Sequence, residues 1–174
     1  MAIRKILTEP DPFLRQKSIA VDEVNDEIRS LMDDMLETMY DAPGIGLAAI
    51  QVGVPKRVIV IDLSKDEEKK NPFYFVNPKI ITKSKQDASY EEGCLSVPNQ
   101  FAEISRPDTC RVDFLDYEGN KKTLEAEGLL ATCIQHEMDH LEGILFIDYL
   151  SKLKKNMIIK KLSKQKKSLE RIVV

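Results

Sequence analysis

Histidine, cysteine and long apolar runs are all scarce in this chain of 174 residues. It contains two histidines and three cysteines, and no stretch approaches the roughly 20 apolar residues that a helix needs to cross a bilayer. An odd number of cysteines without the spacing of a disulfide framework fits a reducing compartment, where thiols stay available as ligands. We therefore expect a cytoplasmic protein with no membrane partner.

The charge of the chain is nearly balanced overall but unevenly distributed. A net charge of −3 and an apolar fraction of 43% favour neither disorder nor bulk binding to DNA. Residues 151–174 hold nine Lys or Arg against the single acid Glu170, a net of +8 that leaves −11 for the rest. We expect a single domain over residues 1–150 and a basic C-terminal helix over residues 151–174, packed on it or extending from it.

Both histidines fall within one short segment. His136 and His140 are four residues apart and Glu137 follows the first, which is the H-E-x-x-H arrangement. On a helix, residues four apart share a face, so both imidazoles can bind one cation while Glu137 stays beside it as a base. Residues 128–134 contain no proline and Gly143 is a plausible stop, so we predict a helix that carries a catalytic metal site.

A catalytic site of this kind usually has a third protein ligand, and the sequence offers two cysteines for it. The metzincin extension would need a histidine where this chain has Phe146, and no downstream carboxylate is well placed. Cys133 shares the helical face of the histidines, but it lies seven residues before His140, a rise of about 10 Å that strains a shared ion. Cys94 comes from a separate segment and closes a tripod more naturally. We favour Cys94 and keep Cys133 as the alternative.

Residues 41–51 are small and rich in glycine, and we predict that they form a loop. The pattern Gly44-x-Gly46-x-x-Ala49 is similar to a dinucleotide fingerprint, but that motif follows a strand and opens a helix. Here the pattern follows a predicted helix. Paired glycines also let another backbone approach closely, so a peptide ligand is the better hypothesis.

The remaining periodicity predicts an α+β fold. We expect mixed or antiparallel strands packed around the central metal-binding helix, with further helices near the N-terminus and at the C-terminus. Pro78 should make its strand irregular or place it at an edge. The predicted elements are an amphipathic helix after the N-cap Asn25, ending before Pro43, and strands over residues 57–63, 73–81, 110–117 and 122–126.

Two other functions would use similar residues. A zincin-like endopeptidase would share the H-E-x-x-H chemistry but would take a His or Glu as third ligand. A structural zinc module would close the site with Cys110 or Cys133, would not hydrolyse anything, and would unfold on chelation.

Three segments together resemble the signature motifs of bacterial peptide deformylases, in the same order and separation. They are GIGLAAIQ at residues 44–51, EGCLS at 92–96 and QHEMDH at 135–140, and the likeness covers nearly the whole chain. The resemblance implies an α+β hydrolase that removes the N-formyl group from the N-terminal formylmethionine of nascent polypeptides and releases formate. The resemblance makes residues 1–150 the catalytic domain, and we expect the protein to act as a monomer.

The resemblance also assigns roles to individual residues. The implied metal ligands are Cys94, His136 and His140. They would hold one divalent ion, Fe(II) in the cell, with Ni, Co or Zn accepted. Metal-bound hydroxide would attack the formyl carbon with Glu137 as general base and then acid. The side chain of Gln51 and the backbone N–H of Leu95 would stabilise the oxyanion.

The resemblance further implies an extended substrate that pairs with the backbone of two segments and places its methionine in an apolar pocket. Tyr90 and Thr132 are polar where aliphatic residues are common in the family, and Phe101 stands where several relatives have a basic residue. The implied substrate-binding residues are Gly44, Ile45, Gly46, Tyr90, Glu92, Gly93, Leu129, Thr132 and Cys133.

The basic tail has two interpretations. Its apolar residues fall on one arc of a helix, which predicts a helix docked on the domain with lysines in solvent. Alternatively, the basic face contacts ribosomal RNA near the nascent chain, because phosphates attract such surfaces. The residues on the apolar arc are Met157, Ile158, Leu162, Leu169 and Ile172.

Overall fold

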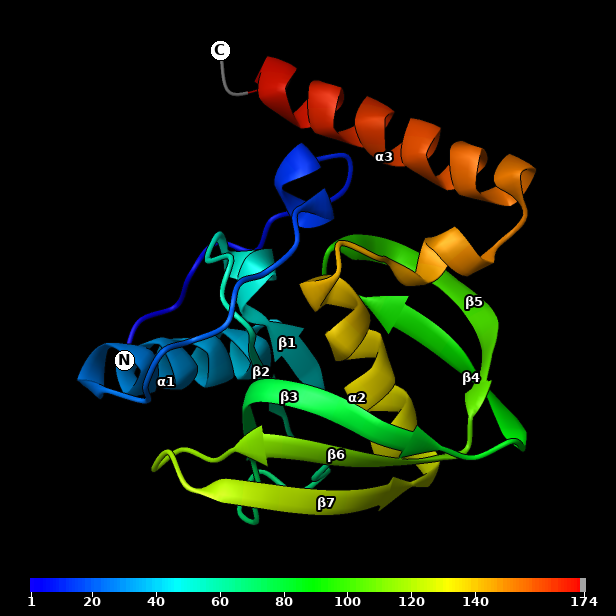
Figure 1. The fold of residues 1–174 in the computed structure, drawn as a ribbon. Coiled ribbons are helices and arrows are strands. Elements are labelled where there is room, and N and C mark those ends of the chain that lie inside the picture. The colour runs from blue at the N-terminus through cyan, green and yellow to red at the C-terminus, as the bar shows by residue number, and fades with distance from the viewer. Residues whose placement is uncertain (173–174) are drawn as a thin grey trace.

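The computed structural model describes the backbone of residues 1–172 and the side chains of residues 1–169. Val173 and Val174, at the end of the expected C-terminal helix, and the Ile172 side chain lie outside the described residues. Figure 1 shows α2 (Gly128–Leu141) running through the middle of the molecule, with a sheet on one side and a β-hairpin on another. The α+β expectation, with helices near both ends, is confirmed.

The larger sheet has five strands in the order β1-β2-β3-β6-β7, and every neighbouring pair is antiparallel. A separate two-stranded hairpin is formed by β4 and β5. The strands are β1 (Gly46–Ala48), β2 (Val58–Ile61), β3 (Phe73–Lys83), β4 (Asp87–Cys94), β5 (Val97–Pro107), β6 (Thr109–Leu115) and β7 (Lys121–Glu127).

Strand β2 shows why the sheet lies between two helices. Its four residues are all buried, and their side chains alternate between two apolar clusters. Ile59 and Ile61 belong to the cluster that contains the inner face of α2. Val58 and Val60 belong to the cluster that contains the apolar face of α1 (Asp26–Asp41). A strand covered on both faces reads as a continuous apolar run, as predicted here.

Helix α1 begins where the sequence predicts. The Asn25 side chain accepts a hydrogen bond from the backbone N–H of Ile28 at 3.1 Å, so one of the free donors of the first turn is satisfied. The helix ends at Asp41, just before Pro43.

Helix α2 ends in a Schellman motif at the predicted glycine. Gly143 has a φ of 75°, and its N–H donates to the carbonyl of His140 at 3.1 Å. The N–H of Ile144 donates to the carbonyl of Asp139 at 2.9 Å. The chain therefore leaves the helix one residue after its C-cap, Glu142.

Two details of the strand assignment differ from the expectations, and a third confirms one of the two alternatives given for Pro78. Residues 41–51 are not a loop throughout, because Gly46–Ala48 pairs with β2 and Ala49–Val52 forms a 3₁₀-helix. β3 is irregular near Pro78, as expected, but it is not an edge strand, because β2 and β6 both pair with it. The β4–β5 hairpin was not predicted, because acidic and polar residues alternate along its exposed face.

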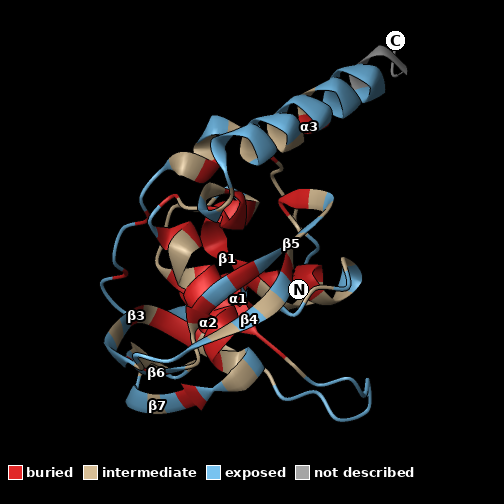
Figure 2. Ribbon diagram, turned by 90° about the vertical axis from the view of Figure 1, so that its right-hand side faces the viewer, coloured by how far each residue is buried: buried red, intermediate tan, exposed pale blue. Residues whose placement is uncertain are grey.

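The C-terminal helix α3 (Lys152–Ile172) is attached mainly through its first half. Leu162 is buried against an apolar cluster that includes Val97 and Phe146, and Lys155 forms an ion pair with Asp148 at 2.7 Å. Figure 2 shows most of α3 exposed and projecting from the body. Among the described residues, no helix combines the length and the apolar character that crossing a membrane requires.

We expect Gly143→Ala to destabilise the protein far more than Gly53→Ala. A Cβ at Gly143 would lie 2.3 Å from the carbonyl oxygen of Arg15, whereas one at Gly53 meets nothing within 4 Å, although both glycines have a positive φ. The left-handed backbone alone costs about 1–2 kcal/mol for alanine, and the added clash should bring Gly143→Ala to about 4 kcal/mol or more.

Urea unfolding of both variants followed by circular dichroism measures this difference. Similar losses for the two variants would show that the contact between Gly143 and Arg15 does not constrain the fold.

Candidate metal centre

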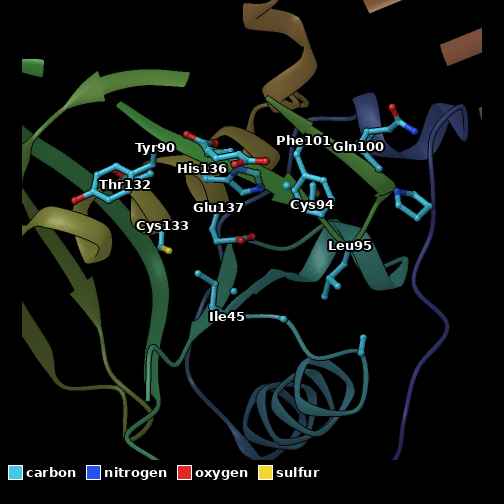
Figure 3. Close-up of a pocket in the computed structure, with 18 of the residues that line it drawn as sticks. Ile45, Tyr90, Cys94, Leu95, Gln100, Phe101, Thr132, Cys133, His136 and Glu137 are labelled. Atoms are coloured by element: carbon cyan, nitrogen blue, oxygen red, sulfur yellow. The ribbon is translucent and has the colours of Figure 1, made fainter. Parts of the chain in front are cut away.

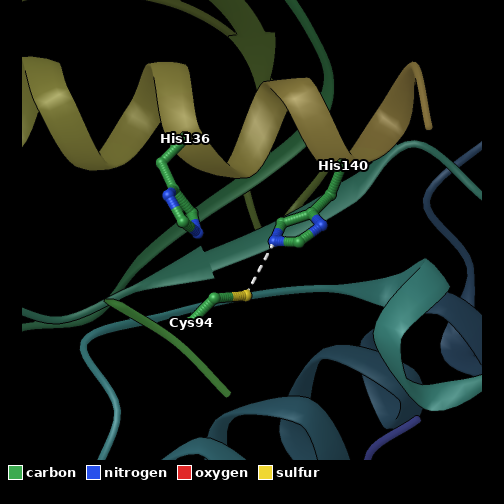
Figure 4. Close-up of side chains that lie close together, drawn as sticks. All are labelled: Cys94, His136 and His140. Atoms are coloured by element: carbon green, nitrogen blue, oxygen red, sulfur yellow. Dashed lines mark hydrogen bonds between the residues drawn. The ribbon is translucent and has the colours of Figure 1, made fainter. Parts of the chain in front are cut away.

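The sulfur of Cys94 and the ring nitrogens of His136 and His140 converge on one point. These ligand atoms all lie within 4.8 Å of one another, and the Cys94 Sγ is 3.3 Å from the His140 Nε2 (Figure 4). One soft sulfur and two imidazole nitrogens form a donor set that suits iron or zinc. The three residues therefore fit a single transition-metal ion.

Two separate elements bring these ligands together. Both histidines project from the same face of α2, with ring centroids 5.1 Å apart. Cys94 is the last residue of β4, where a register shift in the hairpin follows Glu92 and Cys94 pairs with Val97. The hairpin end thus meets the helix face.

The other two cysteines lie elsewhere. Cys133 is buried on α2, and burial, together with the charge of Glu137, raises the pKa of its thiol to about 12. Cys110 is buried in the apolar cluster of the sheet. Among the described residues the group holds three ligands and neither of these cysteines, so the geometry does not match the closed four-ligand site of a structural zinc module.

A chain of polar side chains, buried at Glu92 and Arg106, supports His136 from behind. The Nδ1 of His136 donates to Glu92 at 2.8 Å, which leaves its Nε2 directed toward the other ligands. Arg106 donates twice to Glu92, at 2.7 and 3.0 Å, and once to Asp139 at 2.8 Å. The hydroxyl of Tyr149 completes the chain by donating to Asp139 at 2.7 Å. Arg106 and Tyr149 were not singled out in the sequence, because no local motif links them to the histidines.

The pKa values of the two histidines are shifted in opposite directions, although both side chains are buried. Burial disfavours protonation of His136, but Cys94 and Glu92 beside it outweigh that effect and raise its pKa well above the ordinary value. Burial and the neighbouring His136 lower the pKa of His140. A cation bound here competes with the proton on His136, so its binding depends on pH.

Gln51 is held next to the ligands by three contacts. Its Oε1 accepts from the backbone N–H of Ala48 at 2.9 Å, and its Nε2 donates to the Ser96 hydroxyl at 3.0 Å. The same Nε2 lies 3.6 Å from the Cys94 sulfur. The fixed Oε1 turns the donor end of the amide toward the centre.

Glu137 lies against β1 because Gly46 has no side chain. A Cβ at Gly46 would be 2.5 Å from the Glu137 Oε1. Burial raises the pKa of Glu137 to about 7, while the positive charge of His136 acts in the other direction. The second carboxylate oxygen, Oε2, has no hydrogen-bond partner within the part of the chain that is described.

A cavity of about 550 Å³ opens beside the three ligands (Figure 3). Cys94 and His136 form part of its wall, whereas His140 is fully buried behind them. Glu92, which we expected as a wall residue, both lines the cavity and supports His136. The structure brings every expected substrate-binding residue to this cavity, namely Gly44, Ile45, Gly46, Tyr90, Glu92, Gly93, Leu129, Thr132 and Cys133, along with Gln51, Leu95 and Glu137.

Comparison with known proteins identifies close relatives. The family model described as polypeptide deformylase matches residues 3–156. A peptide deformylase from Pelagibacter ubique is 68% identical over 174 residues, which cover 100% of each chain. A crystal structure of peptide deformylase from Ehrlichia chaffeensis has a TM-score of 0.91 and 42% identity, and covers 96% of this chain and 98% of its own. A second structure from that organism, in complex with actinonin, has a TM-score of 0.91 and 44% identity, with 95% and 98% covered.

We expect Glu92→Gln to weaken metal binding by about 10- to 100-fold, the usual effect of removing a partner that orients a histidine ligand. The amide keeps the shape of the side chain but removes the charge that holds His136 and Arg106. Competition with a chromogenic chelator measures the affinity.

The matched control is Glu91→Gln, because Glu91 is the exposed neighbour on the same strand. The metal affinity of this variant should stay within about twofold of that of the unmodified protein, a much smaller change than the loss of an orienting partner causes. Equal affinities for the two variants would rule out an orienting role for Glu92.

Proposed function

The chain belongs to the peptide deformylase family, and we infer that it removes the N-formyl group from the N-terminal formylmethionine of new polypeptides and releases formate. The observation that carries this function is the position of Cys94, His136 and His140 beside a cavity, with Glu137 on its wall. A closed structural site would have no use for such a cavity. An endopeptidase with a His or Glu as third ligand would not use Cys94.

The proposed ligands are Cys94, His136 and His140, holding one divalent ion. When bound, this ion supplies Lewis acidity and lowers the pKa of a coordinated water. We propose Fe(II) as the ion in the cell, with Ni, Co or Zn as working substitutes. The mixed sulfur and nitrogen donor set supports iron and zinc alike.

Glu137 is the proposed general base and acid. Its buried carboxylate has a pKa near 7 before a cation is present, and the positive charge of a cation favours the ionised form. The ionised group takes a proton from the attacking water and returns one to the departing amine. Glu137 lines the cavity, so its carboxylate lies beside the space in which the water and the substrate are proposed to bind.

Gln51 and the backbone N–H of Leu95 are the proposed donors to the oxyanion that forms at the formyl carbon. Fixed donors of this type contribute about 3 kcal/mol each. The contact from Ala48 to the Oε1 of Gln51 supports this role, because it leaves only the amide nitrogen to face the reacting atoms.

The peptide backbone is proposed to add as a strand beside Ile45, Gly46 and Gly93. β1 is the terminal strand of its sheet in the described part of the chain, so one of its edges is available for pairing. The methionine side chain then enters the cavity between Leu129, Tyr90 and the helix residues Thr132 and Cys133.

We place the reaction in the cytoplasm and propose a monomeric enzyme with residues 1–150 as its catalytic domain. The lysines of α3 support a contact with ribosomal RNA. In the described side chains of this helix, Lys155 is the only lysine in an ion pair, and most of the others are exposed. A row of unneutralised lysines attracts phosphates.

We expect Glu137→Gln to lower formate release by about 10²- to 10⁴-fold, since it removes proton transfer but keeps the size of the side chain. The assay uses an N-formylmethionyl peptide and protein purified without oxygen, loaded with Fe(II) or Ni(II). Metal content should match that of the unmodified protein.

The exposed Glu142, at the end of the same helix, supplies the control variant Glu142→Gln, which should keep normal activity. If Glu137→Gln retained a tenth or more of the activity, Glu137 could not be the main proton carrier.

We expect lysine-to-glutamine changes at the exposed lysines of α3 beyond Lys155 to weaken ribosome binding and to reduce its dependence on salt. Each lost phosphate contact should lower the slope of log affinity against log salt by about 0.7–0.9. Formate release from a free peptide should not change. The lysines to replace are Lys160, Lys161, Lys164, Lys166 and Lys167.

A matched variant replaces five exposed lysines of the body and should bind the ribosome normally. Equal binding by the two variants would contradict a contact through α3. The control positions are Lys65, Lys69, Lys85, Lys121 and Lys122.

A further inference from the structure

The segment near the N-terminus bonds to Gln51 and to Ser96, two residues that are 45 positions apart in the chain. The backbone N–H of Leu7 donates to the carbonyl of Gln51 at 2.7 Å, and that of Glu9 donates to the carbonyl of Ser96 at 2.8 Å. Figure 1 shows this segment beside the 3₁₀-helix that carries Gln51. Residues 7–9 therefore form an arm that joins two distant parts of the site.

These bonds close a ring. The Nε2 of Gln51 donates to the Ser96 hydroxyl at 3.0 Å, so Gln51 and Ser96 are joined both directly and through the arm. Gln51 is 1% exposed, Ser96 is 0% exposed and Glu9 is 6% exposed. Because water has little access to these residues, a bond broken here is not readily replaced by a bond to solvent. The ring thus fixes the backbone and the side chain of Gln51 at the same time.

An ion pair attaches the arm at a second point, outside the ring. Arg15 donates to the carboxylate of Glu9 at 3.2 Å and to the carboxylate of Asp148 at 2.6 Å. The same guanidinium donates to the carbonyl of Gly143 at 3.3 Å. The arm is therefore tied to the segment that follows α2.

The ring includes or adjoins both proposed oxyanion donors. Gln51 is a member of it, and Leu95 directly precedes Ser96 in the turn between β4 and β5. Fixed donors act on the transition state, and a displacement of about 1 Å at such a site can cost about 10² in rate. A ring that sets the separation of Gln51 from this turn should therefore affect the rate of the reaction more than the binding of the substrate.

We propose that Leu7, Glu9 and Ser96 are positioning residues that hold the two oxyanion donors at a fixed separation. This inference rests on the proposed function, in which the Gln51 side chain and the backbone N–H of Leu95 donate to the oxyanion. Leu7 and Glu9 are not among the described residues that line the cavity, so the arm acts through its hydrogen-bond partners.

The test removes one link of the ring at a time. Proline has no N–H, so Leu7→Pro opens the ring at the arm. Its kcat for an N-formylmethionyl peptide should fall about tenfold, part of the 10²- to 10³-fold that the loss of a whole oxyanion donor costs. KM and metal content should stay within about twofold, because neither depends on the transition state. Ser96→Ala opens the ring at its side-chain link and should have the same effect.

The matched control is Thr8→Pro, in the middle of the arm. The N–H of Thr8 makes no hydrogen bond to another backbone group in the described part of the chain. This variant should keep kcat within about twofold, because both links of the arm remain.

A double-mutant cycle separates positioning from a general loss of stability. In Gln51→Ala one of the positioned donors is already missing, so adding Leu7→Pro should lower kcat by no more than about twofold further. A merely structural role would lower kcat by the same factor in both backgrounds.

A kcat for Leu7→Pro within about twofold of that for Thr8→Pro would overturn the proposal. A tenfold fall that persists in the Gln51→Ala background would also overturn it, because the arm would then act by another route. If Leu7→Pro did not fold, Ser96→Ala would carry the same cycle with the same two criteria.

A failure of the proposed function has a different signature. Fully metallated, unmodified protein would then release no formate from the peptide. Formate release that does not respond to Leu7→Pro or Ser96→Ala would leave the deformylase function standing and remove only this inference.

Discussion

The buried carboxylate of Glu92 holds together the two parts of the molecule that must meet for the metal centre to form. Glu92 and Arg106 belong to the β4–β5 hairpin, whereas His136 belongs to α2. Burial opposes ionisation of Glu92, but hydrogen bonds from His136 and Arg106 hold its pKa below the ordinary value. A buried charge is tolerated only when such partners are in place. Because Cys94 ends the same strand, fixing Glu92 against His136 also brings the sulfur to the histidines.

Close backbone approach is the second condition for this site. Gly46 lets the Glu137 carboxylate lie against β1, and Gly143 lets the end of α2 lie against the backbone at Arg15. The contact at Gly46 helps to bury Glu137, and burial is the main cause of the raised pKa of Glu137. The absence of a side chain at Gly46 thus helps to produce a carboxylate suited to proton transfer near neutral pH.

The features that the sequence predicts well depend on local spacing. The four-residue separation of His136 and His140, the N-cap Asn25 and the stop at Gly143 all act within one helix. The missed features depend on contacts between distant segments. Arg106 meets Asp139 across 33 residues, a contact that no local motif indicates. The sequence favours Cys94 over Cys133, as the structure does, but it does not show that the end of a hairpin brings Cys94 to the histidines. Short or acidic strands such as β1 and β4 lack the apolar alternation that identifies a strand.

Helical spacing also relates the metal centre to the cavity beside it. Thr132, His136 and His140 are successive positions four residues apart, so they form one stripe along α2. Thr132 is one turn before the first histidine, a rise of about 5.4 Å along the helix axis. Thr132 lines the cavity at this turn, next to His136. The spacing of one helix therefore sets both the separation of the two histidines and the position of this part of the cavity wall relative to them.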